Sequence, residues 1–205
     1  KEGIQRACFY HLVYAGRGSA MRKDDLSHEE SRHALDIILE RTMDFYKRGL
    51  KKDILTVDNH VDGPYLYMKL KKTDPKRAEE IYKLMEWNGG GANSSGVGIG
   101  NIDFFGNVHA DQFWQDYTFG NVKKRPFGEI WMDTSDPIMK GLKNRLPLLK
   151  GRCNQHVCKW VKLCGGSFRV RALRVYNDPW MQDPACYLTD EEIGIQDKKK
   201  AVGEK

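Results

Sequence analysis

Four of the five cysteines lie in the last third of the chain, and their spacing limits what this region can be. Cys153, Cys158 and Cys164 are separated by four and five residues, and Cys186 follows after a further 21. Four thiolates from one loop and one returning segment suit a tetrahedral zinc ion or an iron–sulfur cluster. A structural zinc site more often has paired C-x-x-C motifs, which this sequence lacks, so the spacing favours a cluster.

The residues around these cysteines refine the predicted ligand set. Gly165 and Gly166 directly follow Cys164, and glycine allows backbone N–H groups to approach sulfur atoms closely. We expect His156 to be a neighbour of Cys158 rather than a ligand. Cys8 lies far away in a strand-like segment, where we expect it to be a buried small hydrophobic residue.

Composition narrows the class of protein and its compartment. The chain has 205 residues, of which 40% are hydrophobic and 30% charged, a balance typical of soluble proteins with a true core. No apolar run approaches the roughly 20 residues of a membrane span, and no signal-peptide pattern opens the chain. We therefore expect a cytoplasmic protein with no membrane partner, in a compartment where thiols stay reduced and bind metals.

The net charge of +6 raises the question of nucleic acid binding. Much of the excess charge lies in short lysine-rich runs and in the C-terminal residues 196–205, which we expect to be a disordered basic tail. Such runs are typical of a solvated surface, so we expect no nucleic acid partner. Arginines near the cysteines are of more interest, because they suit an anionic substrate.

The first 57 residues predict a β–α–β unit with parallel strands. Residues 7–14 are aromatic and β-branched, which indicates a strand that ends in the glycine turn around Arg17. Ser27 and Glu30 form a capping-box pattern for a helix that runs to about residue 48, with Gly49 as its stop. Residues 54–57 form the second strand. One helix face is apolar and is expected to pack inward: Leu35, Ile38, Leu39, Met43 and Tyr46.

A polar cluster, residues 58–63, follows the second predicted strand. Ligands of α/β sheets bind at the carboxyl ends of the strands, so Asp58, Asn59, His60 and Asp62 could orient a substrate or relay a proton. Of these, Asn59 and His60 are the candidate catalytic residues, as a proton donor or a contact to the substrate. The alternative is that Asp58 and Asn59 only cap the next helix. Gly16-Arg-Gly18 has two interpretations as well, an anion-binding turn that contains Arg17 or a plain tight turn.

Further along the chain, Asp74 and Pro75 predict the start of a helix that ends near Trp87. The glycine-rich residues 88–96 indicate a flexible break and a domain boundary. Residues 97–109 predict a β-hairpin with its turn near residues 105–107. Two short helices are expected at 127–131 and 135–145.

Several of these stretches resemble the auxiliary-cluster (SPASM or twitch) domain of radical SAM enzymes: Gly120-Asn-Val, Phe127-Gly-Glu-Ile-Trp131, Cys164-Gly-Gly-Ser-Phe-Arg-Val-Arg-Ala172 and Asp183-Pro-Ala-Cys186. Three others are similar to the tetrapyrrole-modifying branch of that family: Phe9-Tyr-His-Leu-Val-Tyr-Ala-Gly-Arg-Gly18, Thr56-Val-Asp-Asn-His-Val-Asp-Gly63 and Cys186-Tyr-Leu-Thr-Asp-Glu-Glu-Ile-Gly194. The resemblance covers the chain to about residue 195.

The resemblance implies an α/β fold in two parts. Residues 1–95 correspond to the C-terminal portion of a partial (β/α) radical SAM barrel, and residues 96–195 to a small α+β auxiliary domain. It implies one auxiliary [4Fe–4S] cluster held by Cys153, Cys158, Cys164 and Cys186, because Phe168 and His109 stand where further cysteines would be found. The family's Cys-x3-Cys-x2-Cys motif is absent from this sequence. In the complete enzyme that motif holds a second [4Fe–4S] cluster, which cleaves S-adenosylmethionine (SAM). We therefore expect an upstream half as a partner and no catalysis by this chain alone.

The resemblance also implies a substrate and a reaction. The substrate is an iron tetrapyrrole, 12,18-didecarboxysiroheme, which loses acetate groups to give iron coproporphyrin in alternative haem biosynthesis. Its carboxylates make Arg17, Arg169 and Arg171 candidate clamps, and the cluster exchanges electrons with an unidentified donor or acceptor. Two alternatives remain open: an oxo-group-forming enzyme of haem d1 biosynthesis and, in another class, a zinc-stabilised binding module.

Overall fold

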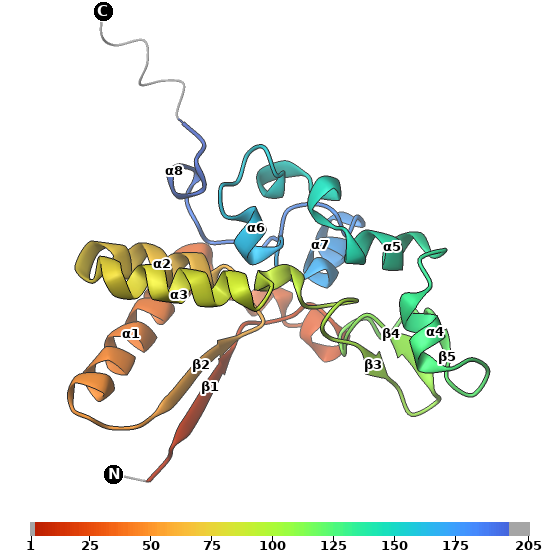
Figure 1. Ribbon diagram of the computed structural model, residues 1–205, viewed down its shortest axis with the longest axis horizontal. Helices are drawn as coiled ribbons and strands as arrows, with labels where there is room; N and C mark the ends of the chain where they lie inside the picture. Colours follow the sequence, from red (N-terminus) through yellow and green to blue (C-terminus); the bar gives the residue numbers. More distant parts are fainter. Residues whose placement is uncertain (1–2, 197–205) are drawn as a thin grey trace, which may run out of the picture.

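A β–α–β unit forms the N-terminal part of the structure. In the computed structural model, which describes residues 3–196, β1 (Arg6–Tyr10) pairs in parallel with β2 (Asp53–Val57), and α1 (His28–Lys47) connects them (Figure 1). The predicted capping box is present, because Ser27 accepts a hydrogen bond from the N–H of Glu30. Gly49 follows the helix with a φ of +67°. The parallel β–α–β prediction is confirmed, although β1 ends at Tyr10 rather than at residue 14.

Two predictions of burial in this unit are wrong. Met43 and Tyr46 are 42% and 78% exposed, because the hydrophobic clusters of the described chain include Leu35 and Leu39 of α1 but no residue of this helix beyond them. Cys8 is exposed rather than buried. Its strand pairs only with β2 within the described residues, so one edge of β1 is open and its neighbours Phe9 and Tyr10 are also exposed, at 46% and 68%.

Two helices follow β2 and pack against each other. The first, α2 (Asp62–Thr73), leads through Asp74 directly into α3 (Pro75–Trp87). The Asp74 carboxylate accepts from the N–H of Arg77 at 2.9 Å, which confirms the predicted helix start. Tyr67, Leu70 and Ala78 form the buried contact between the two helices.

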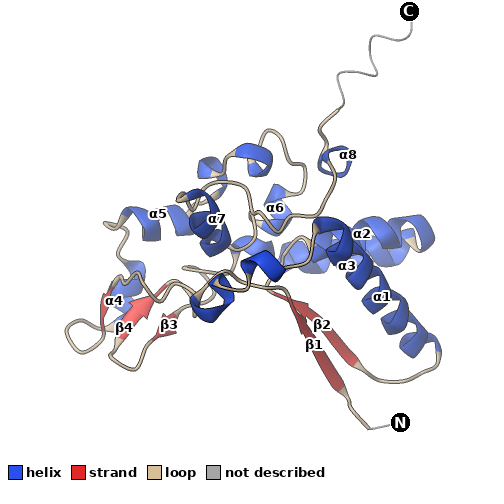
Figure 2. Cartoon of the chain, turned by 180° about the vertical axis from the view of Figure 1, so that it is seen from behind, coloured by secondary structure: helices blue, strands red, loops and turns tan. Residues whose placement is uncertain are grey.

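A small antiparallel sheet lies apart from the first one (Figure 2). Its strands are β3 (Asn101–Ile102), β4 (Asn107–His109) and β5 (Gly120–Asn121), with β4 in the middle. Asp103 closes the β3–β4 turn by accepting from the N–H groups of Phe105 and Asn107, which confirms the predicted hairpin. The predicted short helices are α4 (Phe127–Met132) and α5 (Pro137–Lys143).

Short helices and 3₁₀ turns carry the chain through the cysteine region: η4 (Leu146–Leu148), η5 (Gly151–Cys153), α6 (Val161–Cys164), α7 (Arg169–Tyr176) and α8 (Asp190–Ile193). Three further 3₁₀ turns lie earlier in the chain: η1 (Gly16–Ser19) and η2 (Arg22–Asp24) between β1 and α1, and η3 (Gly90–Ala92) after α3. One core cluster joins this region to the β–α–β unit, because Leu35, Val61 and Tyr65 pack with Tyr187 and Leu188. The architecture confirms the α/β class.

Two further predictions concern the membrane and the tail. Among residues 3–196, no helix combines the length and apolar character that a bilayer crossing requires. The predicted tail, apart from Gln196, lies outside the described residues.

Candidate active site between the strand ends and the cysteine loop

A cavity that we call the strand-end pocket lies at the carboxyl ends of β1 and β2. It has a volume of about 870 Å³. Its walls are residues 9–15, the loop and short helices of residues 18–28, one face of α1, and Pro184 and Ala185 from the segment that leads to Cys186. The pocket therefore lies where α/β folds bind ligands, beside the cysteine region.

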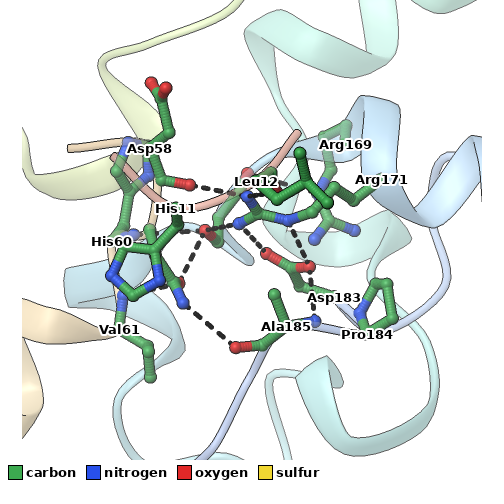
Figure 3. Close-up of polar contacts among 12 residues, drawn as sticks. His11, Leu12, Asp58, His60, Val61, Arg169, Arg171, Asp183, Pro184 and Ala185 are labelled. Atoms are coloured by element: carbon green, nitrogen blue, oxygen red, sulfur yellow. Dashed lines mark hydrogen bonds and ion pairs between the residues drawn. The ribbon is translucent and has the colours of Figure 1, made fainter. Parts of the chain in front are cut away.

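Arg171 on α7 joins the two strand ends to the C-terminal segment (Figure 3). Its guanidinium donates to both carboxylate oxygens of Asp183, at 2.9 and 2.7 Å. It also donates to the backbone oxygens of Leu12, after β1, and of Asp58, after β2. Both side chains of the ion pair are buried, at 0% and 2% exposure. A bidentate pair with this many additional acceptors fixes the geometry of the pocket wall.

The structure does not support the predicted contact of Arg169 and Arg171 with substrate carboxylates. Both residues are 0% exposed. Arg169 donates to the backbone oxygens of Pro179 and Met181, as Arg171 does to those of the strand ends. Both guanidinium groups point into the protein, where they donate to backbone oxygens rather than to the pocket. Arg17, by contrast, is exposed in η1 next to Gly18, a residue of the pocket wall, so its role stays a prediction.

Asn59 makes the contacts of a structural residue. It is 4% exposed, and its amide nitrogen donates to the oxygen of Ala185 at 3.0 Å. Its amide oxygen accepts from the N–H of Val61 in a turn before α2, but the N-cap of this helix is Val61 and no side chain caps it, so the capping interpretation is not confirmed. Asn59 thereby anchors the segment before Cys186, and its catalytic role remains untested.

His60 does not face the strand-end pocket. Its ring packs on Phe168, with the ring centroids 5.2 Å apart, and lines a smaller cavity of about 410 Å³ with Gly91. Burial, aided by the charges of Arg145 and Arg171, lowers the pKa of His60 to about 4. The imidazole is therefore neutral at pH 7, which does not favour the predicted role as a proton donor.

The four predicted cluster cysteines gather around one core. Cys153, Cys158 and Cys164 are buried, and Cys186 is half-buried and packs against the same hydrophobic cluster as Cys153 and Cys158. Burial raises the pKa of the Cys164 thiol, and the charges of the other three cysteines raise it further, so Cys164 lies near each of them. Among the described residues, however, no three Cys, His, Asp or Glu side chains are placed to bind one metal ion. The ligand set stays a prediction.

The environment of these thiols fits an iron–sulfur cluster in one respect. The backbone N–H of Gly166 lowers the pKa of Cys164, and the backbone N–H of Leu188 lowers that of Cys186. Both N–H groups thus favour the thiolate form. Burial nevertheless raises the pKa of Cys186 to about 12. Buried thiols that receive N–H groups need a positive partner to ionise, and a bound cluster supplies one.

Another polar group of the site is formed by His11, Asp62 and Tyr187, of which the sequence indicated only Asp62. His11 follows β1 and lines the strand-end pocket, and its Nε2 lies 3.0 Å from Oδ2 of Asp62. The hydroxyl of Tyr187, next to Cys186, donates to the other carboxylate oxygen at 2.6 Å. The one available signal was that His11 is a polar residue within the predicted strand of residues 7–14. Its partners lie 51 and 176 positions further along the chain, so the sequence could not pair them with it.

Comparison with known proteins identifies relatives of this chain. It is 60% identical over 195 residues to Fe-coproporphyrin III synthase of Methanosarcina barkeri. It is 40% identical over 194 residues to pre-heme d1 synthase of Dinoroseobacter shibae. These matches cover 95% and 94% of the chain but only 48% and 47% of the relatives. No family model matches the chain, and no solved structure does.

The chain thus spans about half the length of these curated relatives. Both are named as synthases, which supports an enzyme over the alternative of a zinc-stabilised binding module. Both names also refer to tetrapyrroles, as the resemblance in the sequence implied. The chain is therefore a homologue of about half of the Fe-coproporphyrin III and pre-heme d1 synthases, in agreement with the tetrapyrrole enzymes that its sequence resembles.

Proposed function

We propose that this chain is the C-terminal half of a radical SAM enzyme of alternative haem biosynthesis. The complete enzyme removes acetate groups from 12,18-didecarboxysiroheme to give iron coproporphyrin. The observation that carries this proposal is the 60% identity, over nearly the whole chain, to a relative named for the product. The upstream half would supply SAM and the cluster that cleaves it.

The cysteine region is proposed to hold an auxiliary [4Fe–4S] cluster through Cys153, Cys158, Cys164 and Cys186. Such a cluster supplies electron transfer at a potential set by burial and by hydrogen bonds to sulfur. The chain contributes backbone N–H groups of Gly166 and Leu188 that favour thiolates. Leu35 of the pocket wall packs in the same hydrophobic cluster as Cys153, Cys158 and Cys186, which supports a single site.

The strand-end pocket is proposed to bind the tetrapyrrole. Its volume of about 870 Å³ is in the range of cofactor-sized cavities, and Pro184 and Ala185 link its wall directly to Cys186. Arg171 holds the ends of both strands against this segment. The role of this brace is to keep the pocket wall at a fixed distance from the cysteines and to exclude water from between them.

A second candidate function is the formation of pre-haem d1, because the chain is 40% identical to a relative of that name. Both candidates use the same kind of substrate, so the product decides between them. Mass spectrometry of the reaction of the complete enzyme with didecarboxysiroheme distinguishes loss of acetate from gain of oxygen. Detection of an oxygenated product would contradict the first proposal.

Anaerobic reconstitution of the full-length enzyme tests the cluster. Replacement of Cys186 by Ala should remove about four irons and a matching amount of acid-labile sulfide, because one [4Fe–4S] cluster loses a ligand. Cys8→Ala is the matched control and should keep all its iron, since Cys8 lies exposed in β1. One zinc bound per chain in place of iron and sulfide would contradict the proposal.

A further inference from the structure

His11 is the histidine best placed to meet a molecule in the strand-end pocket. It lies directly after β1, lines the pocket, and its side chain keeps 20% of its surface exposed. His60, the histidine that the sequence favoured, lines the smaller cavity instead. The ring of His11 stacks on Tyr187, with centroids 6.4 Å apart and planes 18° apart, so its face is fixed.

The hydrogen bonds of His11 leave one ring nitrogen for a ligand. Nε2 is paired with Oδ2 of Asp62 at 3.0 Å. A carboxylate on one ring nitrogen fixes the orientation of the imidazole. Nδ1 is then the ring nitrogen left for a ligand, and it donates to an acceptor in the doubly protonated ring, in which both nitrogens carry a hydrogen.

Asp62 is itself held from a second direction. The Tyr187 hydroxyl donates to Oδ1 at 2.6 Å, and the Asp62 side chain is only 10% exposed. Both carboxylate oxygens therefore have a partner, one from the strand end and one from the segment after Cys186. A carboxylate bound on both sides cannot swing away from the histidine when a ligand enters.

The other charges of the pocket make this position selective. Asp24, Asp25 and Asp58 also line the pocket, and they repel an anion. Asp25 is occupied by the Tyr14 hydroxyl at 2.8 Å, and burial raises the pKa of Asp58, which favours its neutral form. With Arg169 and Arg171 buried away from the pocket, the basic side chains that line it are His11, Arg22 and His28. Arg22 and His28 are exposed, and Nε2 of His28 is already bonded to the backbone oxygen of Pro184 at 2.7 Å, so His11 is the most enclosed of the three.

We infer that His11 binds a carboxylate of the substrate through Nδ1, with Asp62 and Tyr187 as positioning residues that act through His11. This inference rests on the proposed function, because it takes the ligand of the pocket to be a tetrapyrrole with carboxylate side chains. His11 thus takes the role that the sequence assigned to Arg169 and Arg171.

Binding of iron coproporphyrin to the full-length protein, followed by the visible absorption of the tetrapyrrole, tests the inference. His11→Phe should weaken binding about tenfold or more, the size expected for loss of a charge-assisted hydrogen bond. His11→Gln retains an amide donor and should recover part of the affinity, which a purely structural role of the ring would not predict. His33→Phe, on the exposed face of α1, is the control and should bind like the unaltered protein.

Double variants test the positioning roles. Asp62→Asn and Tyr187→Phe should each weaken binding several-fold in the unaltered background and have no further effect in the His11→Phe background. Equal effects in both backgrounds would show that they act independently of His11 and would overturn the positioning roles. Thermal unfolding of each variant separates loss of folding from loss of binding.

The outcomes separate the inference from the proposed function. If the unaltered protein binds iron coproporphyrin and His11→Phe binds it equally well, the inference is overturned and the proposed function stands. If the unaltered protein does not bind the tetrapyrrole, the proposed function fails, and the inference fails with it.

Discussion

Arg171 is a cation without exposure to solvent, and its environment determines its role. Its partner Asp183 is also buried, and the guanidinium has backbone acceptors at both strand ends. A sequence shows that an arginine is near the cysteines, but not that a carboxylate 12 positions later will fold back on it. The residue type therefore suggested a substrate clamp, whereas the contacts indicate a structural brace.

Breaking this ion pair should be costly. Arg171→Met leaves the Asp183 carboxylate buried and unpaired, and we expect it to lower the free energy of unfolding by about 3–5 kcal/mol. Denaturant unfolding measures this change. Arg174→Met is the control, because its pair with Asp116 is 33% and 55% exposed and should contribute less than about 1 kcal/mol. Equal losses in the two variants would contradict the brace.

The same pair predicts acid sensitivity. Burial alone would raise the pKa of Asp183, but the charge and hydrogen bonds of Arg171 outweigh it and leave the pKa below its usual value. A carboxyl group with a lowered pKa in the folded state stabilises the fold above its unfolded pKa of about 3.9 and loses that contribution as pH falls further. The free energy of unfolding, measured from pH 6 down to about pH 2, should show this loss. The double variant that carries both Arg171→Met and Asp183→Leu should show less of it.

At the scale of elements, the contact between η3 and α6 determines how the glycine-rich stretch is used. A Cβ atom on Gly91 would lie 2.1 Å from the backbone oxygen of Cys164, and one on Gly165 would lie 2.4 Å from the nitrogen of Ala92. Composition alone indicates a flexible break at residues 88–96. In the structure, the backbone of residues 91–92 in η3 lies directly against the backbone of residues 164–165 at the end of α6. Only glycine allows two backbone segments to approach this closely.

A pair of glycine substitutions tests this contact. Gly91→Ala forces apart η3 and the backbone after α6, and we expect a loss of about 1–3 kcal/mol in stability. Gly128→Ala is the control, since an added Cβ there meets nothing within 4 Å in the exposed part of α4. Helix propensity predicts that this variant is as stable as the unaltered protein or more so. Thermal unfolding compares the two, and a harmless Gly91→Ala would contradict the close packing.

Local signals predicted the elements well where a cap or a turn defines them. Ser27 with Glu30, and Asp74 with Pro75, placed the starts of α1 and α3 because their bonds lie within four residues. The contacts of the site, in contrast, join residues such as Asp62 and Tyr187, which are 125 positions apart. No periodicity or capping pattern encodes such a pairing, so the His11 group could not be found from the sequence.

For the whole molecule, the open edge of β1 is the most informative surface. Phe9 and Tyr10 are exposed beside it, and the relatives are about twice as long as the chain. If the chain completes a barrel with an upstream half, another parallel strand should pair with β1 and cover both aromatic rings.

Hydrogen exchange tests this expectation. Backbone amides of residues 6–10 should exchange more slowly in the full-length protein than in the chain alone. A strand of the upstream half would supply acceptors for the N–H groups on the open edge of β1. The amide of Val108 is the control, since β4 already lies between β3 and β5. Unchanged exchange in β1 would contradict the pairing.

The segment from Asp183 to Tyr187 has a consequence for how the protein is made. Its residues bind in turn Arg171, His28, Asn59 and Asp62, and Cys186 among them is the last of the gathered cysteines. During translation these five residues leave the ribosome after all their partners. The pocket wall and the cysteine site should therefore be completed at the same moment, so that a cluster delivered to the nascent chain before residue 187 emerges would find neither its last thiol nor a closed pocket.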